Sequence, residues 1–154
     1  ERARPLFLVH HVGARPRGDA HAARGQPHHL AGPLPLAGVE PPAGDVHWNL
    51  GDDLGRRYGA ISGDRNPIHL YPLTAKAFGF PRQIAHGMWT KAHCLAAISD
   101  KLPDSFTVDV EFKKPILLPG TVVFGSTTKG KKTTFGVQDA HSSAPHVVGR
   151  VSPV

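Results

Sequence analysis

Several residue types that identify particular classes of protein are scarce in this chain of 154 residues. Cysteine occurs once, as Cys94, which excludes an internal disulfide framework and predicts a reducing compartment, the cytoplasm. No apolar run approaches the roughly 18 residues of a membrane span, so membrane insertion is not expected. The apolar stretch at residues 6–9 is too short for the core of a signal peptide.

Acidic residues are also in the minority, with 12 Asp and Glu against 18 Lys and Arg, giving a formal net charge of +6. A basic balance favours anionic partners such as a phosphorylated cofactor, an acidic carrier protein or nucleic acid. The charge alone does not choose among these partners, and it equally fits an ordinary solvated surface.

Lysine is absent from residues 1–45, which instead contain seven prolines and six glycines. This segment shows no sustained period of 2 or 3.6 residues, so it cannot readily bury one face. We therefore predict an irregular N-terminal arm or remnant at residues 1–45 and one domain at residues 46–154. The histidine pairs at 10–11 and 28–29 have no standard metal-site spacing, and no metal site is predicted.

Helices are predicted first within the domain. An apolar stripe of Leu54, Tyr58 and Ile61 predicts a helix that starts at residues 52–53 and ends at Gly63. Pro72 opens a second, short helix over residues 73–78. A third helix begins near residue 87 and is predicted to be heavily buried. Its predicted buried face consists of Met88, Ala92, Leu95, Ala96, Ala97 and Ile98.

The hydrophobic period changes to 2 after these helices. Residues 106–113 alternate apolar and polar side chains, which is typical of a half-buried strand. Three further strands are predicted at residues 121–128, 133–140 and 145–151. The order predicts an α+β domain in which an antiparallel meander wraps around the third helix.

Two residues with acid–base chemistry, Asp64 and His69, are separated by five positions. On a continuous helix they would point about 140° apart, so they can meet only if the backbone breaks. Pro67 supplies that break and can open a new turn, with His69 near its start. A helix dipole there would lower the pKa of the imidazole and favour its neutral form. The same residues would also suit an ordinary turn and helix cap.

A longer pattern surrounds these two residues. The sequence YGAISGDRNPIH at residues 58–69, followed by IAHGM at 84–88 and FKKPILLPG at 112–120, closely resembles the signature of the MaoC-like, or (R)-specific enoyl-CoA hydratase, family. The resemblance covers about residues 46–125. It implies a hotdog fold, in which a curved antiparallel sheet wraps around one long helix, and it implies a homodimer.

The resemblance also implies the chemistry. The expected reaction is reversible hydration of trans-2-enoyl thioesters of coenzyme A or acyl carrier protein to (3R)-hydroxyacyl thioesters in fatty acid metabolism. Asp64 and His69 are expected to activate water, and the Gly87 amide is expected to bind the thioester oxygen. No metal or other cofactor is implied. Four further residues are predicted to bind substrate: Ser62, Asn66, His86 and Met88.

Other roles for these residues stay open at this point. Ser62 and Asn66 would serve equally well to hold the loop, and His86 is expected to order the start of the helix rather than to act as a base. The same fold supports an acyl-thioesterase or a noncatalytic acyl-CoA-binding protein. Nucleic-acid binding is not expected, because aromatic and basic residues do not interleave in a recognition motif. The P-loop-like residues 125–132 are predicted to form a hairpin turn, since a strand pattern follows them.

Overall fold

The computed structural model describes residue 36 and residues 38–154. Most of the predicted arm at residues 1–45, including both histidine pairs, lies outside this part, so its architecture stays a prediction.

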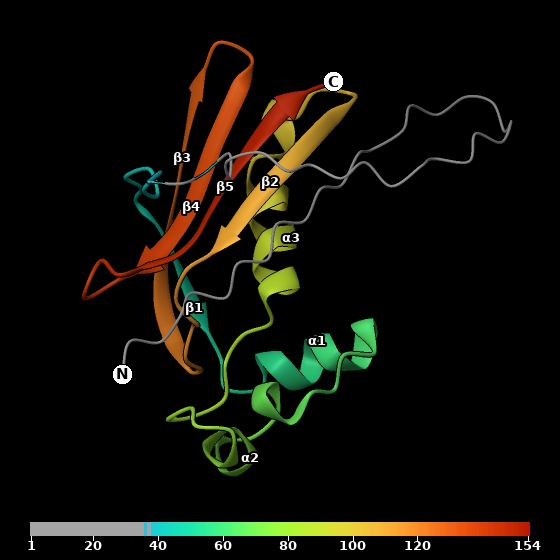
Figure 1. The fold of residues 1–154 in the computed structure, drawn as a ribbon, viewed down its shortest axis with the longest axis vertical. Coiled ribbons are helices and arrows are strands. Elements are labelled where there is room, and N and C mark those ends of the chain that lie inside the picture. The colour runs from blue at the N-terminus through green and yellow to red at the C-terminus, as the bar shows by residue number, and fades with distance from the viewer. Residues whose placement is uncertain (1–35, 37) are drawn as a thin grey trace, which may run out of the picture.

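One antiparallel sheet forms the body of the domain (Figure 1). Its strand order is β1-β3-β4-β5-β2. The strands are β1 (Val46–Leu50), β2 (Phe106–Phe112), β3 (Gly120–Lys129), β4 (Lys132–Asp139) and β5 (Pro145–Pro153). The four predicted strands are confirmed, and β1 is an addition that lies at one edge of the sheet.

The predicted meander is correct only for β3, β4 and β5. Strand β2 pairs with β5, with Val110 opposite Gly149, and lies at the edge farthest from β1. The reason is that β3 is already occupied on both sides, by β1 and by β4. A two-residue turn at Gly130, with φ of 60°, joins β3 to β4, which confirms the hairpin predicted for residues 125–132.

The helices are α1 (Leu54–Ser62), α2 (Pro72–Ala77) and α3 (Gly87–Ala97). Glycines with positive φ follow α1 and α2: Gly63 at 78° and Gly79 at 87°. These helices therefore end where the sequence predicted. A 3-10 turn at Pro67–His69 confirms that Pro67 breaks the backbone between Asp64 and His69.

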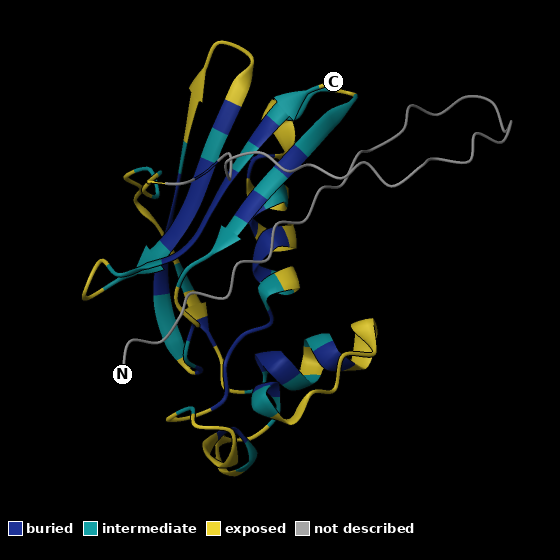
Figure 2. Cartoon of the chain, in the orientation of Figure 1, coloured by how far each residue is buried: buried dark blue, intermediate teal, exposed yellow. Residues whose placement is uncertain are grey.

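Helix α3 packs against one face of the sheet, and the core lies between them (Figure 2). Cys94 and Ile98 on the helix side meet fully buried strand residues such as Val110, Phe135 and Val137. This arrangement of one helix against an antiparallel sheet is the α+β architecture predicted from the sequence.

The buried face of α3 differs from the predicted one. Of the predicted face, Ile98 is buried and Leu95 is half-buried, but Met88, Ala92, Ala96 and Ala97 are exposed in the single chain. Thr90, Lys91 and Cys94 are buried instead. Polar residues can occupy the inner face because the Thr90 hydroxyl donates to the His86 carbonyl at 3.2 Å. Burial lowers the pKa of Lys91. An apolar stripe of α3 is consequently left uncovered.

In the part of the chain that the structure describes, no helix has the length and apolar character needed to cross a membrane.

Candidate active site

The loop between α1 and the 3-10 turn is held by its own side chains. The Ser62 hydroxyl donates to the Tyr58 carbonyl at 2.9 Å and accepts the Asp64 amide at 3.2 Å. Next, Asp64 Oδ1 accepts the Asn66 amide at 3.2 Å, and Asn66 Oδ1 accepts the Ile68 amide at 3.3 Å. These consecutive turns lead directly into the 3-10 turn, so Ser62 and Asn66 each have a role in shaping the loop.

Two glycines let α1 lie directly on the backbone of this loop. A Cβ on Gly55 would overlap the His69 carbonyl oxygen, and a Cβ on Gly59 would lie 2.8 Å from the Asp64 carbonyl oxygen. The predicted apolar stripe is wrong at Ile61, which is 85% exposed. Helix α1 instead buries the face that carries Leu54, Gly55 and Gly59.

His69 is fixed in orientation beneath α1. It is 8% exposed, and its Nδ1 lies 2.8 Å from the Ile84 carbonyl oxygen. Because a carbonyl oxygen only accepts, Nδ1 carries the proton, and Nε2 of the neutral ring is left with a lone pair.

The pKa of His69 is lowered from 6.5, first by burial, with a smaller lowering from His86. The hydrogen bond to Ile84 and the carboxylate of Asp64 act in the opposite direction. The neutral form predicted from the sequence is thus favoured, but the predicted cause was wrong. His69 ends the 3-10 turn, and burial is the dominant influence.

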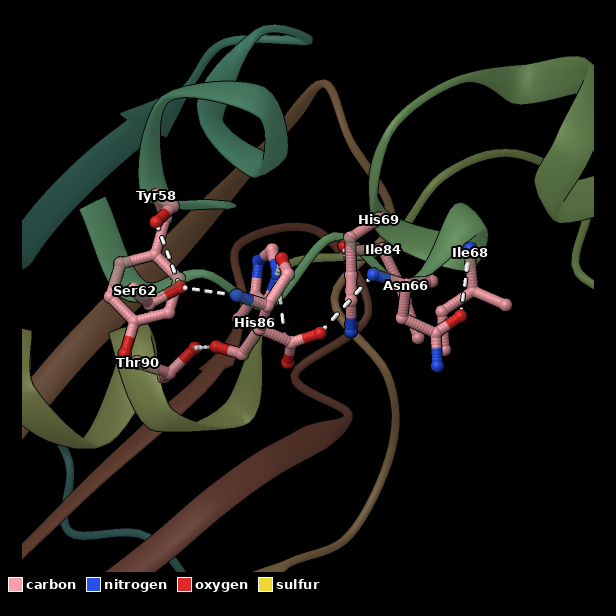
Figure 3. A network of polar contacts seen from close by, with 9 residues as sticks. Tyr58, Ser62, Asn66, Ile68, His69, Ile84, His86 and Thr90 are labelled. Carbon is pink, nitrogen blue, oxygen red and sulfur yellow. Dashed lines mark hydrogen bonds and ion pairs between the residues drawn. The ribbon is translucent and has the colours of Figure 1, made fainter. Parts of the chain in front are cut away.

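Asp64, His69 and His86 converge at one point, and Figure 3 shows the two histidines side by side there. One carboxylate or ring-nitrogen atom from each residue lies within 4.8 Å of the others. The Asp64 side chain is 55% exposed, whereas both histidines are buried. A carboxylate open to solvent therefore lies beside a buried imidazole with an accepting nitrogen, which suits acid–base work on a bound water.

The same three side chains do not suit a metal ion. The rings of His69 and His86 are stacked, with centroids 3.7 Å apart and planes 24° from parallel. Imidazole lone pairs lie in the ring plane, so those of stacked rings run side by side instead of meeting at about 2.1 Å from one ion. In addition, His86 Nε2 already donates to the Asp64 carbonyl oxygen at 2.9 Å.

Helix α3 begins beside these residues, at Gly87. A Cβ on Gly87 would lie 2.9 Å from the ring of Phe112 on β2, so close packing between α3 and β2 already requires a glycine here. Met88 follows on the exposed side of α3, at 39% exposure. The backbone amides of the first helical turn have no acceptor within a helix, which makes this turn a potential donor to an anionic oxygen.

A separate hollow of about 310 Å³ lies between β1, α1 and α3. Trp48, Trp89 and His93 line it, and the His93 ring stacks on Trp89 at 4.7 Å. None of the predicted site residues lines this hollow. Asp64 and His69 therefore lie outside this hollow.

The sequence singled out Asp64 and His69, which the structure brings together, but not the residues that support them. Tyr58, whose ring lies 4.8 Å from that of His86, was predicted only as part of the apolar helix stripe and of the family pattern. Gly55 and Gly59 were assigned no role, although their four-residue spacing is a signal for close helix packing. The Ile84 carbonyl could not be identified from the sequence, because any residue type supplies one.

The chain matches known proteins over most of the domain. Residues 40–149 match the family described as MaoC like domain. The 3-hydroxyacyl-thioester dehydratase X of Mycobacterium tuberculosis is 56% identical over 66 residues, which are 43% of this chain and 24% of that protein.

Solved structures agree in fold. The crystal structure of HtdX of Mycobacterium tuberculosis superposes with a TM-score of 0.69 at 36% identity, over 72% of this chain and 48% of that chain. The R-hydratase PhaJ1 of Pseudomonas aeruginosa gives a TM-score of 0.57 at 25% identity, over 77% of this chain and 83% of that one. The chain thus spans about half of the length of the HtdX chain and 24% of the length of the curated dehydratase X. It spans most of the length of the R-hydratase.

Proposed function

The chain belongs to the MaoC-like domain family and has its hotdog fold, and on this basis we propose that it reversibly hydrates trans-2-enoyl thioesters to (3R)-hydroxyacyl thioesters. The carrying observation is the convergence of the Asp64 carboxylate with His69, whose Nδ1 is committed to Ile84 and whose Nε2 is left to accept a proton. The names of the related proteins, a 3-hydroxyacyl-thioester dehydratase and an R-hydratase, support the same reaction class.

The proposed reaction adds one water across the C2=C3 bond of the substrate. The carbonyl of the thioester makes C3 electrophilic, so the water oxygen forms a bond to C3 while His69 Nε2 and Asp64 hold the water and remove its proton. The C2=C3 electron pair moves toward the thioester carbonyl. His69 and Asp64 then return a proton to C2. The thioester bond stays intact. Because one pair serves both carbons, addition is syn, and dehydration uses the same groups in reverse.

Negative charge develops on the thioester oxygen during this step, so a donor is needed there. We assign that role to the Gly87 amide at the start of α3. The proposal is supported by the position of this amide in the first helical turn, next to His86 and the site. Ser62, Asn66 and Met88 are proposed to border the substrate, with Ser62 and Asn66 also shaping the loop.

We propose a homodimer as the working form. Its support is that α1, α2 and α3 all leave large apolar side chains exposed in the single chain, namely Ile61, Leu73, Phe78 and Met88. A second copy would cover this surface and exclude water from the acyl chain. The substrate is proposed to be an acyl thioester of coenzyme A or acyl carrier protein, with no metal or redox cofactor. A cytoplasmic location is also proposed, because the sequence has a single cysteine and therefore no internal disulfide.

The test is the loss of enoyl-thioester absorbance with crotonyl-CoA and a longer trans-2-enoyl-CoA. We expect turnover by the parent protein and a loss of about 10²- to 10⁴-fold in Asp64→Asn, the usual contribution of a positioned acid or base. This substitution preserves the oxygen that accepts the Asn66 amide, so the loop should keep its shape.

Asp53→Asn is the matched control, because Asp53 is a carboxylate paired with Arg57 at 3.1 Å on the neighbouring helix. Its rate should equal that of the parent. Release of free thiol instead of hydration would indicate a thioesterase, and binding without reaction would indicate an acyl-CoA-binding protein. Near-normal hydration by Asp64→Asn would remove Asp64 from the mechanism.

A further inference from the structure

His86 is enclosed between two aromatic rings at the start of α3 (Figure 3). The His69 ring covers one side, with centroids 3.7 Å apart, and the Tyr58 ring lies 4.8 Å away at 60°. The side chain of His86 is 2% exposed. A residue with so little open surface has almost nothing to offer a substrate, although the sequence placed it among the substrate-binding residues.

The contacts of His86 go to the residues that bind water in the proposed reaction. Its Nε2 donates to the Asp64 carbonyl oxygen at 2.9 Å, so the backbone of Asp64 is attached to the start of α3. The Asp64 carboxylate is farther away, with Oδ2 at 3.8 Å, too long for a hydrogen bond. The carboxylate therefore remains available, while the backbone that carries it is fixed.

The stacked face of His86 restrains His69 in a second way. Beyond its covalent attachment, the His69 ring is held at one atom, Nδ1, by the hydrogen bond to the Ile84 carbonyl. This hydrogen bond by itself would still allow the ring plane to rotate. Contact with the His86 ring limits this rotation and holds Nε2 in one direction. His86 is itself anchored, because its carbonyl accepts both the amide and the hydroxyl of Thr90, at 3.1 and 3.2 Å.

From these contacts we infer that His86 is a positioning residue for the proposed hydration: it ties the Asp64 backbone to α3 and holds the His69 ring by stacking. This inference rests on the proposed function of Asp64 and His69. It assigns no proton transfer to His86. Tyr58 completes the arrangement by covering the other side of the His86 ring.

Two substitutions separate the two contacts. His86→Phe keeps a ring for stacking and loses the donor to Asp64, whereas His86→Gln keeps a donor near the Nε2 position and loses the ring. We expect kcat to fall about 10- to 100-fold in each, with KM changed less than about twofold, since displacing reacting groups by about 1 Å has costs of this order. His86→Ala, which loses both contacts, should be slower than either.

The pH profile gives a readout that a merely structural residue would not change. His86 contributes to lowering the pKa of His69, so its removal should raise that pKa and move the acidic limb of kcat/KM to higher pH. His146→Gln is the matched control: His146 is another buried histidine with a 3.0 Å bond to a backbone carbonyl, that of Lys114, and it is not a member of the site. Its acidic limb should remain in place.

The stacking contact can also be followed without any turnover, through the NMR chemical shifts of the His69 ring protons, assigned with His69→Gln. A changed ring shift in folded His86→Gln, which loses the stacked ring, with a smaller change in His86→Phe, which keeps one, supports the inference even if the parent protein hydrates no enoyl thioester, a result that would count only against the proposed function. Unchanged His69 ring shifts in His86→Gln, or unchanged kcat in both folded variants of an active parent, would overturn the positioning role. If His86→Gln does not fold, His86→Ala, which also loses the ring, takes its place.

Discussion

The glycines of α1 provide a sharp test of how the fold sets the site. Gly→Ala inside a helix ordinarily stabilises a protein by roughly 0.5–1 kcal/mol. Here we expect the opposite at Gly55, because the new Cβ would overlap the His69 carbonyl oxygen and force helix and loop apart. Overpacking of this kind costs about 1–3 kcal/mol in free energy of unfolding.

The catalytic effect should be larger than the effect on stability. Real Cβ atoms stay at least 3.0 Å from such an oxygen, so Gly55→Ala requires a shift of roughly 1 Å in the backbone that carries His69, and about 100-fold loss of kcat. At Gly59 the Cβ would lie 2.8 Å from the Asp64 carbonyl oxygen, so a shift of a few tenths of an ångström suffices. The loss should therefore be smaller for Gly59→Ala than for Gly55→Ala.

Urea unfolding and initial rates with crotonyl-CoA measure both effects. Ala60→Ser on the same helix is the control, because Ala60 is exposed and lies outside the proposed site and dimer surface, so this change should alter neither quantity appreciably. A stabilised and fully active Gly55→Ala variant would show that α1 does not press on the loop as described, and the account of how His69 is placed would be refuted.

Three further predictions concern acid–base behaviour, the oxyanion donor and assembly. Since burial lowers the pKa of His69 from 6.5 and only its neutral form accepts a proton, the acidic limb of kcat/KM should have its midpoint below pH 6.5; a midpoint above pH 6.5 would contradict this. A Cβ at Gly87 would crowd both Phe112 and the substrate, so Gly87→Ala should be compared with its parent in a Phe112→Leu background. Loss of kcat there supports the Gly87 amide as the oxyanion donor, and an unaffected rate argues against that role. The purified chain of 16.5 kDa should sediment as a dimer and Met88→Glu as a monomer, whereas a monomeric parent would contradict the proposed homodimer.

The sequence predicted the local chemistry better than the burial of the helices. Pro67 and Gly63 act through the backbone of their immediate neighbours, so the break before His69 and the end of α1 could be read directly. The inner faces of α1 and α3 could not. Helix α1 buries glycines, and α3 buries Thr90 and Lys91, so neither inner face appears as an apolar stripe.

The pairing of strands distant in the sequence could also not be predicted from local sequence patterns. Residues 46–50 do alternate, with apolar Val46, Trp48 and Leu50 at every second position, but the run has only five residues. The strand β3 that pairs with it lies far along the chain. Trp48 stacks on Phe124 of β3 with ring centroids 4.9 Å apart, a contact between residues 76 positions apart in the chain. The place of β2 beside β5 likewise depends on which strand edges are already occupied, which no local period reveals.

In the proposed reaction one pair, Asp64 and His69, delivers water to a single face of an intact enoyl thioester. Hydration of crotonyl-CoA in water enriched in ¹⁸O and deuterium tests it directly by mass spectrometry and NMR of the product. We expect a (3R)-hydroxyacyl-CoA with ¹⁸O at C3, one deuterium added to C2 on the same face, and no ¹⁸O in the thioester carbonyl. Addition to opposite faces, or ¹⁸O in a released free acid, would contradict it.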